Sequence, residues 1–321
     1  MQNTFSIARI LRKREIGALI PLIIIFILAS MSNPAFSSLA NILNMLRSSA
    51  YIFIAGVGMT FILCGRGLDL SIGSQVGLAG VVLGVLTVWW NVPIWISVAV
   101  TLIVGFAAGA FNGFLITGLN IPPFIATLAT YYGYRGILEG VTKGSPITPM
   151  PEEFLVLGQG AFLGVQYVIW FIVLLFLCAS FVLRKTKYGR YILAMGGNAE
   201  STRLAGINTR RVAFSMYVIS AGLACTAGIF FTSRFSSAQP STGMGMELRV
   251  IAACIIGGVS LFGGAGSITG TLIGSIFLVV LDNGMIMAHI SGYWQQTVIG
   301  LIIIIAISID LARKGELFNS G

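Results

Sequence analysis

The chain has 321 residues, of which 56% are hydrophobic and only 9% are charged, whereas soluble domains average roughly 25% charged residues. This composition, with a mean hydropathy of +0.94, excludes a soluble globule and indicates a protein that meets lipid over most of its surface. If each crossing takes about 20 apolar residues, ten crossings use about 200 residues, which leaves short loops and excludes a separate soluble catalytic domain.

Ten apolar runs follow one another along the chain, and we predict that each forms a transmembrane helix. The runs cover residues 16–33, 48–65, 70–90, 93–116, 121–141, 165–183, 212–232, 249–262, 267–286 and 293–311. Glycines interrupt the eighth run before it can cross a core of about 30 Å, so that run is predicted to be broken or re-entrant. The expected fold is an all-α polytopic membrane protein with a single transmembrane domain over residues 1–321.

Basic side chains gather in three places that flank the apolar runs. They are Arg9, Arg12, Lys13 and Arg14; Arg184, Lys185, Lys187, Arg190, Arg203, Arg210 and Arg211; and Arg313 and Lys314. The positive-inside rule places all three groups in the cytoplasm, and an even number of crossings agrees. We therefore expect residues 1–15, 184–211 and 312–321 to be cytoplasmic. Because these charges flank spans, the net charge of +9 predicts no nucleic-acid partner.

Glycines recur at every fourth position in several runs, as at Gly105, Gly109 and Gly113. This spacing puts them on one helix face, where two backbones can approach closely. Tight helix packing is therefore expected. A nucleotide-binding loop is the alternative, but the GxxxxGK[ST] pattern is absent from the sequence.

Two glycine-broken polar stretches, residues 67–73 and 258–264, form a weak internal repeat. Each opens a helix of small residues, and we expect the spans around the first to run in the opposite sense to those around the second. Inverted repeats with broken helices recur among transporters. The sequence therefore predicts two inverted-repeat halves.

Polar side chains inside the apolar runs are few, and each is costly to insert. Asp69 stands at the opening of the third run, where its carboxylate either caps that helix or faces a polar pathway. The polar residues that we predict to line a substrate pathway are Asp69, Ser71, Ser74, Gln75 and Asn112.

Three further ionisable groups lie in or beside apolar runs. Arg135 and Glu139 are four residues apart on one predicted helix and are expected to neutralise each other. Asp282 lies near the predicted outer end of the ninth run, where water can reach it.

The sequence lacks the patterns that mark enzymes and metal sites. Its cysteines, Cys64, Cys178, Cys225 and Cys254, stand singly, which predicts neither a disulfide framework nor a zinc site. His289 is the one histidine, and no GxSxG elbow accompanies it. No catalytic residue, metal or cofactor is therefore expected, and nothing supports a membrane enzyme.

The polar segment 184–211 contains a short predicted helix. Asn198 suits its N-cap, Glu200 suits its positive end and Gly206 suits the position after its last turn. So short a helix is marginal alone and needs a packing partner. It is either a loop on the lipid surface or a helix that docks into a groove of a cytoplasmic partner, presenting Leu204, Ala205 and Ile207.

Several fragments occur in an order that is typical of one transporter family. They are Val57-Gly-Met-Thr60, Gly67-Leu-Asp-Leu-Ser-Ile-Gly-Ser74, Pro123-Phe-Ile-Ala-Thr-Leu128, Gly196-Gly-Asn-Ala-Glu200, Arg203-Leu-Ala-Gly-Ile207, Ser237-Ala-Gln-Pro240, Ile251-Ala-Ala253 and Gly270-Thr-Leu-Ile-Gly274. In this ordered set the chain resembles the membrane permeases of bacterial ABC importers for sugars, of the ribose, galactose and xylose type. These permeases fall within a larger group that includes branched-chain amino-acid permeases.

The resemblance implies partners and a location. Such permeases lie in the bacterial inner membrane as pairs of identical or related chains, contact a cytoplasmic ATPase and receive sugar from a periplasmic binding protein. The segment 196–207 is similar to their coupling segment. The residues that the resemblance assigns to ATPase coupling are Gly197, Asn198, Glu200, Arg203, Leu204, Ala205, Gly206 and Ile207.

The chain departs from the family pattern at two positions. Many relatives have glycine where Arg66 stands, and an acidic residue or glutamine where Arg249 stands. Glu247 and Arg249 are therefore expected to form a local pair near the periplasmic mouth. Gln239 is expected to lie at the same mouth. The resemblance extends to sugars and sugar-like solutes rather than to ribose itself.

A second hypothesis is an ion-coupled secondary transporter of a small polar solute. The predicted inverted repeat supports it, and Asp69 and Asp282 would be its candidate proton or sodium sites. Uptake that survives ATP depletion but collapses with the ion gradient would favour this hypothesis.

Overall fold

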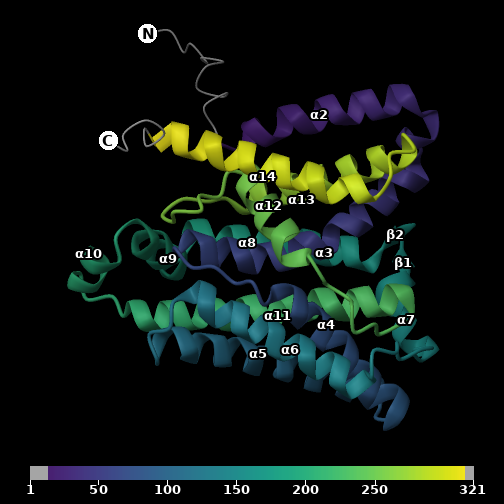
Figure 1. Cartoon of the computed structure of the whole chain (residues 1–321), viewed down its shortest axis with the longest axis horizontal. Helices are drawn as coiled ribbons and strands as arrows, with labels where there is room; N and C mark the ends of the chain where they lie inside the picture. Colours follow the sequence, from purple (N-terminus) through teal and green to yellow (C-terminus); the bar gives the residue numbers. More distant parts are fainter. Residues whose placement is uncertain (1–13, 315–321) are drawn as a thin grey trace.

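A computed structural model describes residues 14–314, which form helices apart from one small hairpin (Figure 1). The ends of the predicted cytoplasmic termini, residues 1–13 and 315–321, lie outside the described residues. In chain order the elements are α2 (Arg14–Ser32), η1 (Pro34–Ser37), α3 (Leu39–Cys64), α4 (Ile72–Gly84), η2 (Val85–Trp89), α5 (Ile94–Thr117), α6 (Pro123–Thr142), α7 (Glu152–Gln159), β1 (Ala161–Phe162), β2 (Val165–Gln166), α8 (Tyr167–Lys185), α9 (Lys187–Gly197), α10 (Ala199–Leu204), α11 (Thr209–Phe235), α12 (Met246–Ile256), α13 (Ile268–Met287) and α14 (Tyr293–Lys314).

Each of the ten predicted apolar runs overlaps a helix. Six of the described helices are long and apolar enough to cross a membrane: α3, α4 continued by the π-helical η2, α5, α8, α11 and α13. The chain is therefore an all-α, multi-pass membrane protein. The short eighth run forms α12, whose 11 residues span about 16 Å at 1.5 Å per residue, well below the thickness of about 30 Å of a hydrocarbon core.

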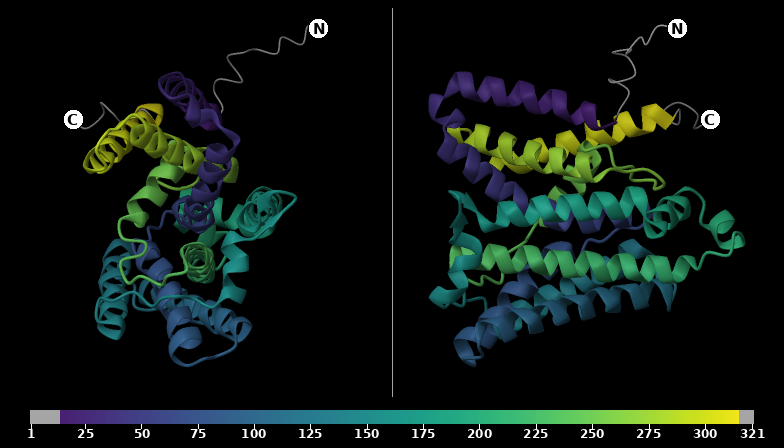
Figure 2. Two further views of the ribbon diagram at one scale, coloured as in Figure 1. Left: turned by 90° about the vertical axis from the view of Figure 1, so that its right-hand side faces the viewer. Right: turned by 180° about the vertical axis from the view of Figure 1, so that it is seen from behind.

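Helix α3 lies at the centre of the molecule, and most of its side chains are buried (Figure 2). It packs against α11, which also contacts α4 and α5. The contact with α11 is close because Gly58 has no side chain: a Cβ there would lie 2.6 Å from the Cα of Ser220. In contrast, most side chains of α8 face outward, as expected for a helix that meets lipid.

The glycine faces pack helices together, as the spacing predicted. On α5, Cβ atoms added to Gly105, Gly109 and Gly113 would all meet residues of α11, among them Cys225 and Tyr217. On α13, a Cβ at Gly270 would lie 1.9 Å from the carbonyl oxygen of Gly257. These helices approach so closely that even one methyl group does not fit.

The molecule has two distinct ends. Helices α9 and α10 lie at one end, whereas α7 and the β1–β2 hairpin lie at the other (Figure 1). The start of α2 and the end of α14 lie at the α9–α10 end (Figure 2). An even number of crossings requires this arrangement.

The predicted sense of the internal repeat is wrong. The two glycine-broken connections, residues 65–71 and 257–267, meet at the α9–α10 end, where Gly264 N–H donates to the carbonyl of Cys64 over 2.9 Å. Helices α3 and α12 therefore both run toward this end, and α4 and α13 both return from it. Both stretches close a hairpin at the same end, so this pair does not itself support two inverted-repeat halves, and those halves stay a prediction.

Candidate functional site

The predicted short helix of the 184–211 segment is present as α10, and its caps are the predicted ones. Asn198 Oδ1 accepts a hydrogen bond from the Ser201 N–H over 2.8 Å, and Gly206 adopts a φ of +84° after the last turn. Glu200 and Arg203 form an exposed ion pair of 3.8 Å. Helix α9 precedes α10, and the sequence analysis did not predict it.

Helix α10 projects beyond the rest of the bundle (Figure 1), so one of its faces is free. Leu204 is 79% exposed, a high value for a large apolar side chain at a polar tip. Among the residues predicted to couple to a partner, all are exposed except Ile207, which is half-buried and packs against the core. Ile207 therefore contacts the bundle with part of its side chain, and its contact with a partner stays a prediction.

A contact between backbones joins the α9–α10 segment to the bundle. A Cβ at Gly196 would lie 1.8 Å from the carbonyl oxygen of Cys64, at the end of α3, and 2.5 Å from the nitrogen of Gly264. Arg66, beside this contact, adopts a φ of +64°, in the left-handed region that glycine enters freely. Helix α9 is therefore in close backbone contact with the end of α3 and with the connection between α12 and α13.

Four of the five predicted pathway residues form one hydrogen-bonded cluster. Asp69 Oδ1 accepts from the N–H and the hydroxyl of Ser71, over 2.9 and 2.5 Å. Ser71 Oγ in turn accepts from the amides of Gln75 and Asn112, over 2.7 and 2.8 Å. Ser74 donates separately to the Ser71 carbonyl.

These five side chains are fully buried and none lines an open route in this structure. Asp69 bonds to Ser71, the residue that precedes α4, and no side-chain hydrogen bond caps that helix, so the capping and the pathway interpretations both stay predictions. Three acceptor oxygens, Asp69 Oδ2, Gln75 Oε1 and Asn112 Oδ1, have no hydrogen-bond partner among the described residues.

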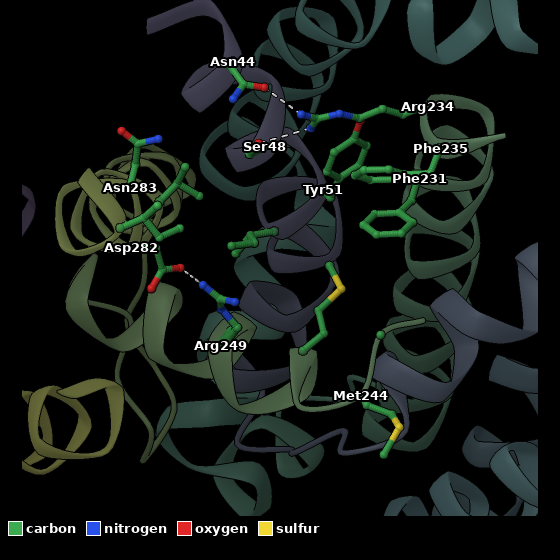
Figure 3. Close-up of a pocket in the computed structure, with 15 residues that line it drawn as sticks. Asn44, Ser48, Tyr51, Phe231, Arg234, Phe235, Met244, Arg249, Asp282 and Asn283 are labelled. Carbon is green, nitrogen blue, oxygen red and sulfur yellow. Dashed lines mark hydrogen bonds and ion pairs between the residues drawn. The ribbon is translucent and has the colours of Figure 1, made fainter. Parts of the chain in front are cut away.

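A cavity of about 470 Å³ lies where α3 begins and α11 ends, at the hairpin end of the molecule, and Figure 3 shows the side chains that line it. Parts of α3, α11, α12 and α13 converge on it, although they are far apart in the sequence. Its lining residues are Asn44, Ser48, Tyr51, Ile52, Phe231, Arg234, Phe235, Gly243, Met244, Met246, Arg249, Val279, Asp282, Asn283 and Ile286. The sequence analysis identified only two of them, Arg249 and Asp282, as functional candidates.

The ion pair in this cavity differs from the predicted one. Arg249 Nη2 pairs with Asp282 Oδ2 on α13 rather than with Glu247. The carboxylate of Glu247 lies beside the backbone of Gly73 instead. The side chains of Glu247 and Arg249 therefore have different neighbours. Gln239 is exposed on the connection between α11 and α12.

Arg234 occupies the opposite wall of the cavity (Figure 3). Its guanidinium donates to Asn44 Oδ1 over 2.7 Å and to Ser48 Oγ over 3.1 Å. It also lies 5.8 Å from the centre of the Tyr51 ring and 5.1 Å from that of Phe235. The sequence analysis did not consider Arg234, which follows the predicted run 212–232 and belongs to none of the three basic groups.

Arg135 was expected to pair with Glu139, but its hydrogen bonds go to backbone carbonyl groups instead. Arg135 is buried and donates to the carbonyl oxygens of Pro240 and Thr242, whereas Glu139 is exposed. The arginine thereby fastens α6 to the connection between α11 and α12.

A second cavity, of about 290 Å³, lies near the α9–α10 end. Arg66, Asn120, Arg210 and Tyr217 are among its lining residues. Within residues 14–314, no three His, Cys, Asp or Glu side chains come together as metal ligands would.

Comparison of the sequence with known proteins places the chain among transporter permeases. The family model described as "Branched-chain amino acid transport system / permease component" matches residues 41–307. The chain is 38% identical to the ribose import permease of Haemophilus influenzae, over 96% of each chain. It is 34% identical to the autoinducer 2 import system permease of Salmonella choleraesuis, over 91% of this chain and 84% of that one.

A further relative is the xylose transport system permease of Escherichia coli, at 32% identity over 93% of this chain and 91% of that one. No solved structure matches the chain.

Proposed function

The chain belongs to the branched-chain amino acid transport system permease family, as its motifs indicated, and from this premise we propose that it imports a sugar or sugar-like solute. It is a transporter component rather than an enzyme. The relatives described above carry the names of ribose, xylose and autoinducer 2 importers, and the sequence contains no nucleotide-binding loop. A separate ATPase subunit therefore drives the transport.

The ATPase binds at α10. The observation that carries this assignment is the 79% exposure of Leu204 on a capped helix that projects from the bundle. Gly197, Asn198, Glu200, Arg203, Ala205 and Gly206 surround it on the exposed surface. When the ATPase subunits close on ATP, they move α10, and the backbone contact at Gly196 passes the movement to α3.

The orientation follows from charge. The basic residues of the 184–211 segment lie at the α9–α10 end, whereas the hairpin end carries Glu152 and Glu153 at the start of α7. By the positive-inside rule the α9–α10 end is cytoplasmic, and both termini share that side. The chain then crosses the inner membrane as one domain with ten segments, of which α12 is the incomplete one.

The outer, hairpin end receives the solute from a periplasmic binding protein, and Gln239, Glu247 and Arg249 lie at this end. A second permease, either identical or related, completes the transporter. The cluster of Asp69, Ser71, Ser74, Gln75 and Asn112 is buried in this state. An alternating-access transporter closes its route at one point in each state, so we assign these residues to the closed section of the route.

Reconstitution tests the proposed function. The chain should accumulate D-ribose or D-xylose in proteoliposomes only when its ATPase, its binding protein and ATP are all present. The chain without the ATPase should neither hydrolyse ATP nor accumulate sugar. Uptake by the chain alone that collapses with an ion gradient would overturn the proposal and establish ion-coupled transport.

The variant Leu204→Glu tests the ATPase contact. A charge on the docking face should lower the affinity for the ATPase at least tenfold, which corresponds to ~1.4 kcal/mol, with membrane insertion unchanged. Leu163→Glu is the matched control, because Leu163 is equally exposed, at 79%, but lies at the hairpin end. The measurement is the amount of ATPase that copurifies with each variant, and equal amounts for both variants would contradict the assignment.

A further inference from the structure

The cavity between α3, α11, α12 and α13 is suited to bind a ligand. We infer that it is a binding site for a neutral, polyhydroxylated ligand of monosaccharide size, formed within a single permease chain. The inference rests on the proposed function and deepens it, since it locates the solute in the outer half of the protein.

The volume and the location of the cavity fit a small solute. Its volume of about 470 Å³ lies within the range of roughly 300–1,000 Å³ that is common for small-molecule sites. Four helices that come from separate parts of the chain converge on it, so the site exists only in the folded protein. It opens at the hairpin end, where a binding protein would release its cargo.

The two walls offer different chemistry (Figure 3). One wall presents the Arg249–Asp282 pair, which supplies donors and an acceptor side by side. The other wall presents Tyr51, Phe231 and Phe235. A sugar has hydroxyl groups at its edge and C–H groups on its face, so it can bind both walls at once.

Hydrogen-bonding capacity remains unused at the ion pair. Arg249 Nε and Asp282 Oδ1 are buried and have no hydrogen-bond partner among the described residues. Buried polar groups of proteins are normally satisfied by protein, water or ligand. A hydroxyl group donates and accepts, so one hydroxyl can serve both atoms once the two side chains turn toward the cavity.

The charges of the cavity exclude other ligand classes. A cation would meet the two guanidinium groups, and an anion would compete with Asp282 for Arg249, so either charge would disturb the existing ion pair. Arg234 already donates to Asn44 and Ser48, so it is held in place without a carboxylate. An apolar ligand would desolvate the ion pair without replacing the lost hydrogen bonds. A neutral polyol is the class that satisfies the whole lining.

Thiol labelling tests occupancy directly. Met244 lines the cavity and is 60% exposed, so Met244→Cys should react with a small water-soluble maleimide in a Cys178→Ser background, which removes the exposed native cysteine. The probe is D-ribose or D-xylose, whichever the complete importer transports, added without binding protein or ATP. It should slow labelling of Met244→Cys at least threefold. It should not slow labelling of Leu163→Cys, a control at the same end outside the cavity.

Transport kinetics provide the second measurement. In the complete importer, Asp282→Asn should raise the KM for sugar at least tenfold, whereas Leu163→Glu, outside the cavity, should leave the KM unchanged. If Asp282→Asn fails to fold, Phe235→Leu, which removes only an aromatic face, should raise the KM severalfold. Unchanged labelling together with an unchanged KM would overturn the cavity assignment alone, whereas a wild-type importer that takes up neither sugar would overturn the proposed function as well.

Discussion

Asp69 illustrates how a charged residue can be held inside a membrane protein without an opposing charge. Its carboxylate accepts hydrogen bonds from the backbone N–H and the hydroxyl of Ser71. The Ser71 hydroxyl oxygen in turn accepts hydrogen bonds from the side-chain amides of Gln75 and Asn112. The cluster joins the start of α4 to α5. Its role in the described state is therefore to fix the position of these two helices.

This arrangement predicts different effects for two substitutions of Asp69. Asp69→Ala leaves the buried donors of Ser71 unpaired, which costs about 1–3 kcal/mol, so the purified protein should melt at a lower temperature. Asp69→Asn keeps an acceptor oxygen and removes a buried charge, so it should melt at or above the wild-type temperature. Melting of both variants in detergent checks the prediction. Equal losses for both would show that the charge itself stabilises the cluster.

At the scale of elements, α9 joins the proposed docking helix α10 to the helix bundle. Helix α9 ends at a glycine pair whose two members have opposite environments. Gly196 is wedged against the carbonyl of Cys64 and the nitrogen of Gly264, whereas a Cβ at Gly197 would meet nothing within 4 Å. The two residues are adjacent, so they form a matched pair for testing this contact.

We predict that Gly196→Ala destabilises the protein and impairs transport, whereas Gly197→Ala leaves the melting temperature unchanged because a Cβ there meets nothing within the chain. A methyl group at Gly196 would lie 1.8 Å from the Cys64 oxygen, so α9 has to shift, and forced overpacking of this kind costs about 1–3 kcal/mol. ATP-driven sugar uptake and the melting temperature should both fall for Gly196→Ala. Normal uptake by Gly196→Ala would show that movement of α10 does not pass through this contact.

At the scale of the whole molecule, the two ends carry different functions. The α9–α10 end holds the proposed docking helix and one cavity, and the hairpin end holds the larger cavity of the two. The fully buried Asp69 cluster lies in the interior. Under the proposed function, a solute that enters at one end leaves at the other only after a rearrangement, as alternating access requires.

The topology can be tested by labelling single cysteines in intact cells. In the Cys178→Ser background, Ser201→Cys on exposed α10 should resist a membrane-impermeant maleimide until the cells are opened. Leu163→Cys, in the turn between β1 and β2, should react in intact cells. The reverse pattern would place α10 outside, which would contradict both the orientation and the assignment of the ATPase contact.

Local features of the chain could be predicted from its sequence because they depend on neighbouring residues alone. The apolar runs gave the helices, and the glycine spacing gave the close helix faces. Asn198 and Gly206 gave the caps of α10, since capping is a matter of one side chain and a few backbone groups. The predicted inverted sense of the repeat failed because it depended on where two distant connections meet.

The family and the membrane character were determined by the sequence itself, through hydropathy and the order of its motifs. Only the tertiary structure decided which charges meet. Arg249 pairs with Asp282 on another helix instead of with nearby Glu247, and Arg135 binds carbonyl groups more than a hundred residues away. The physical reason is that a buried charge requires a partner at hydrogen-bonding distance, and packing between helices, not separation along the chain, sets that distance.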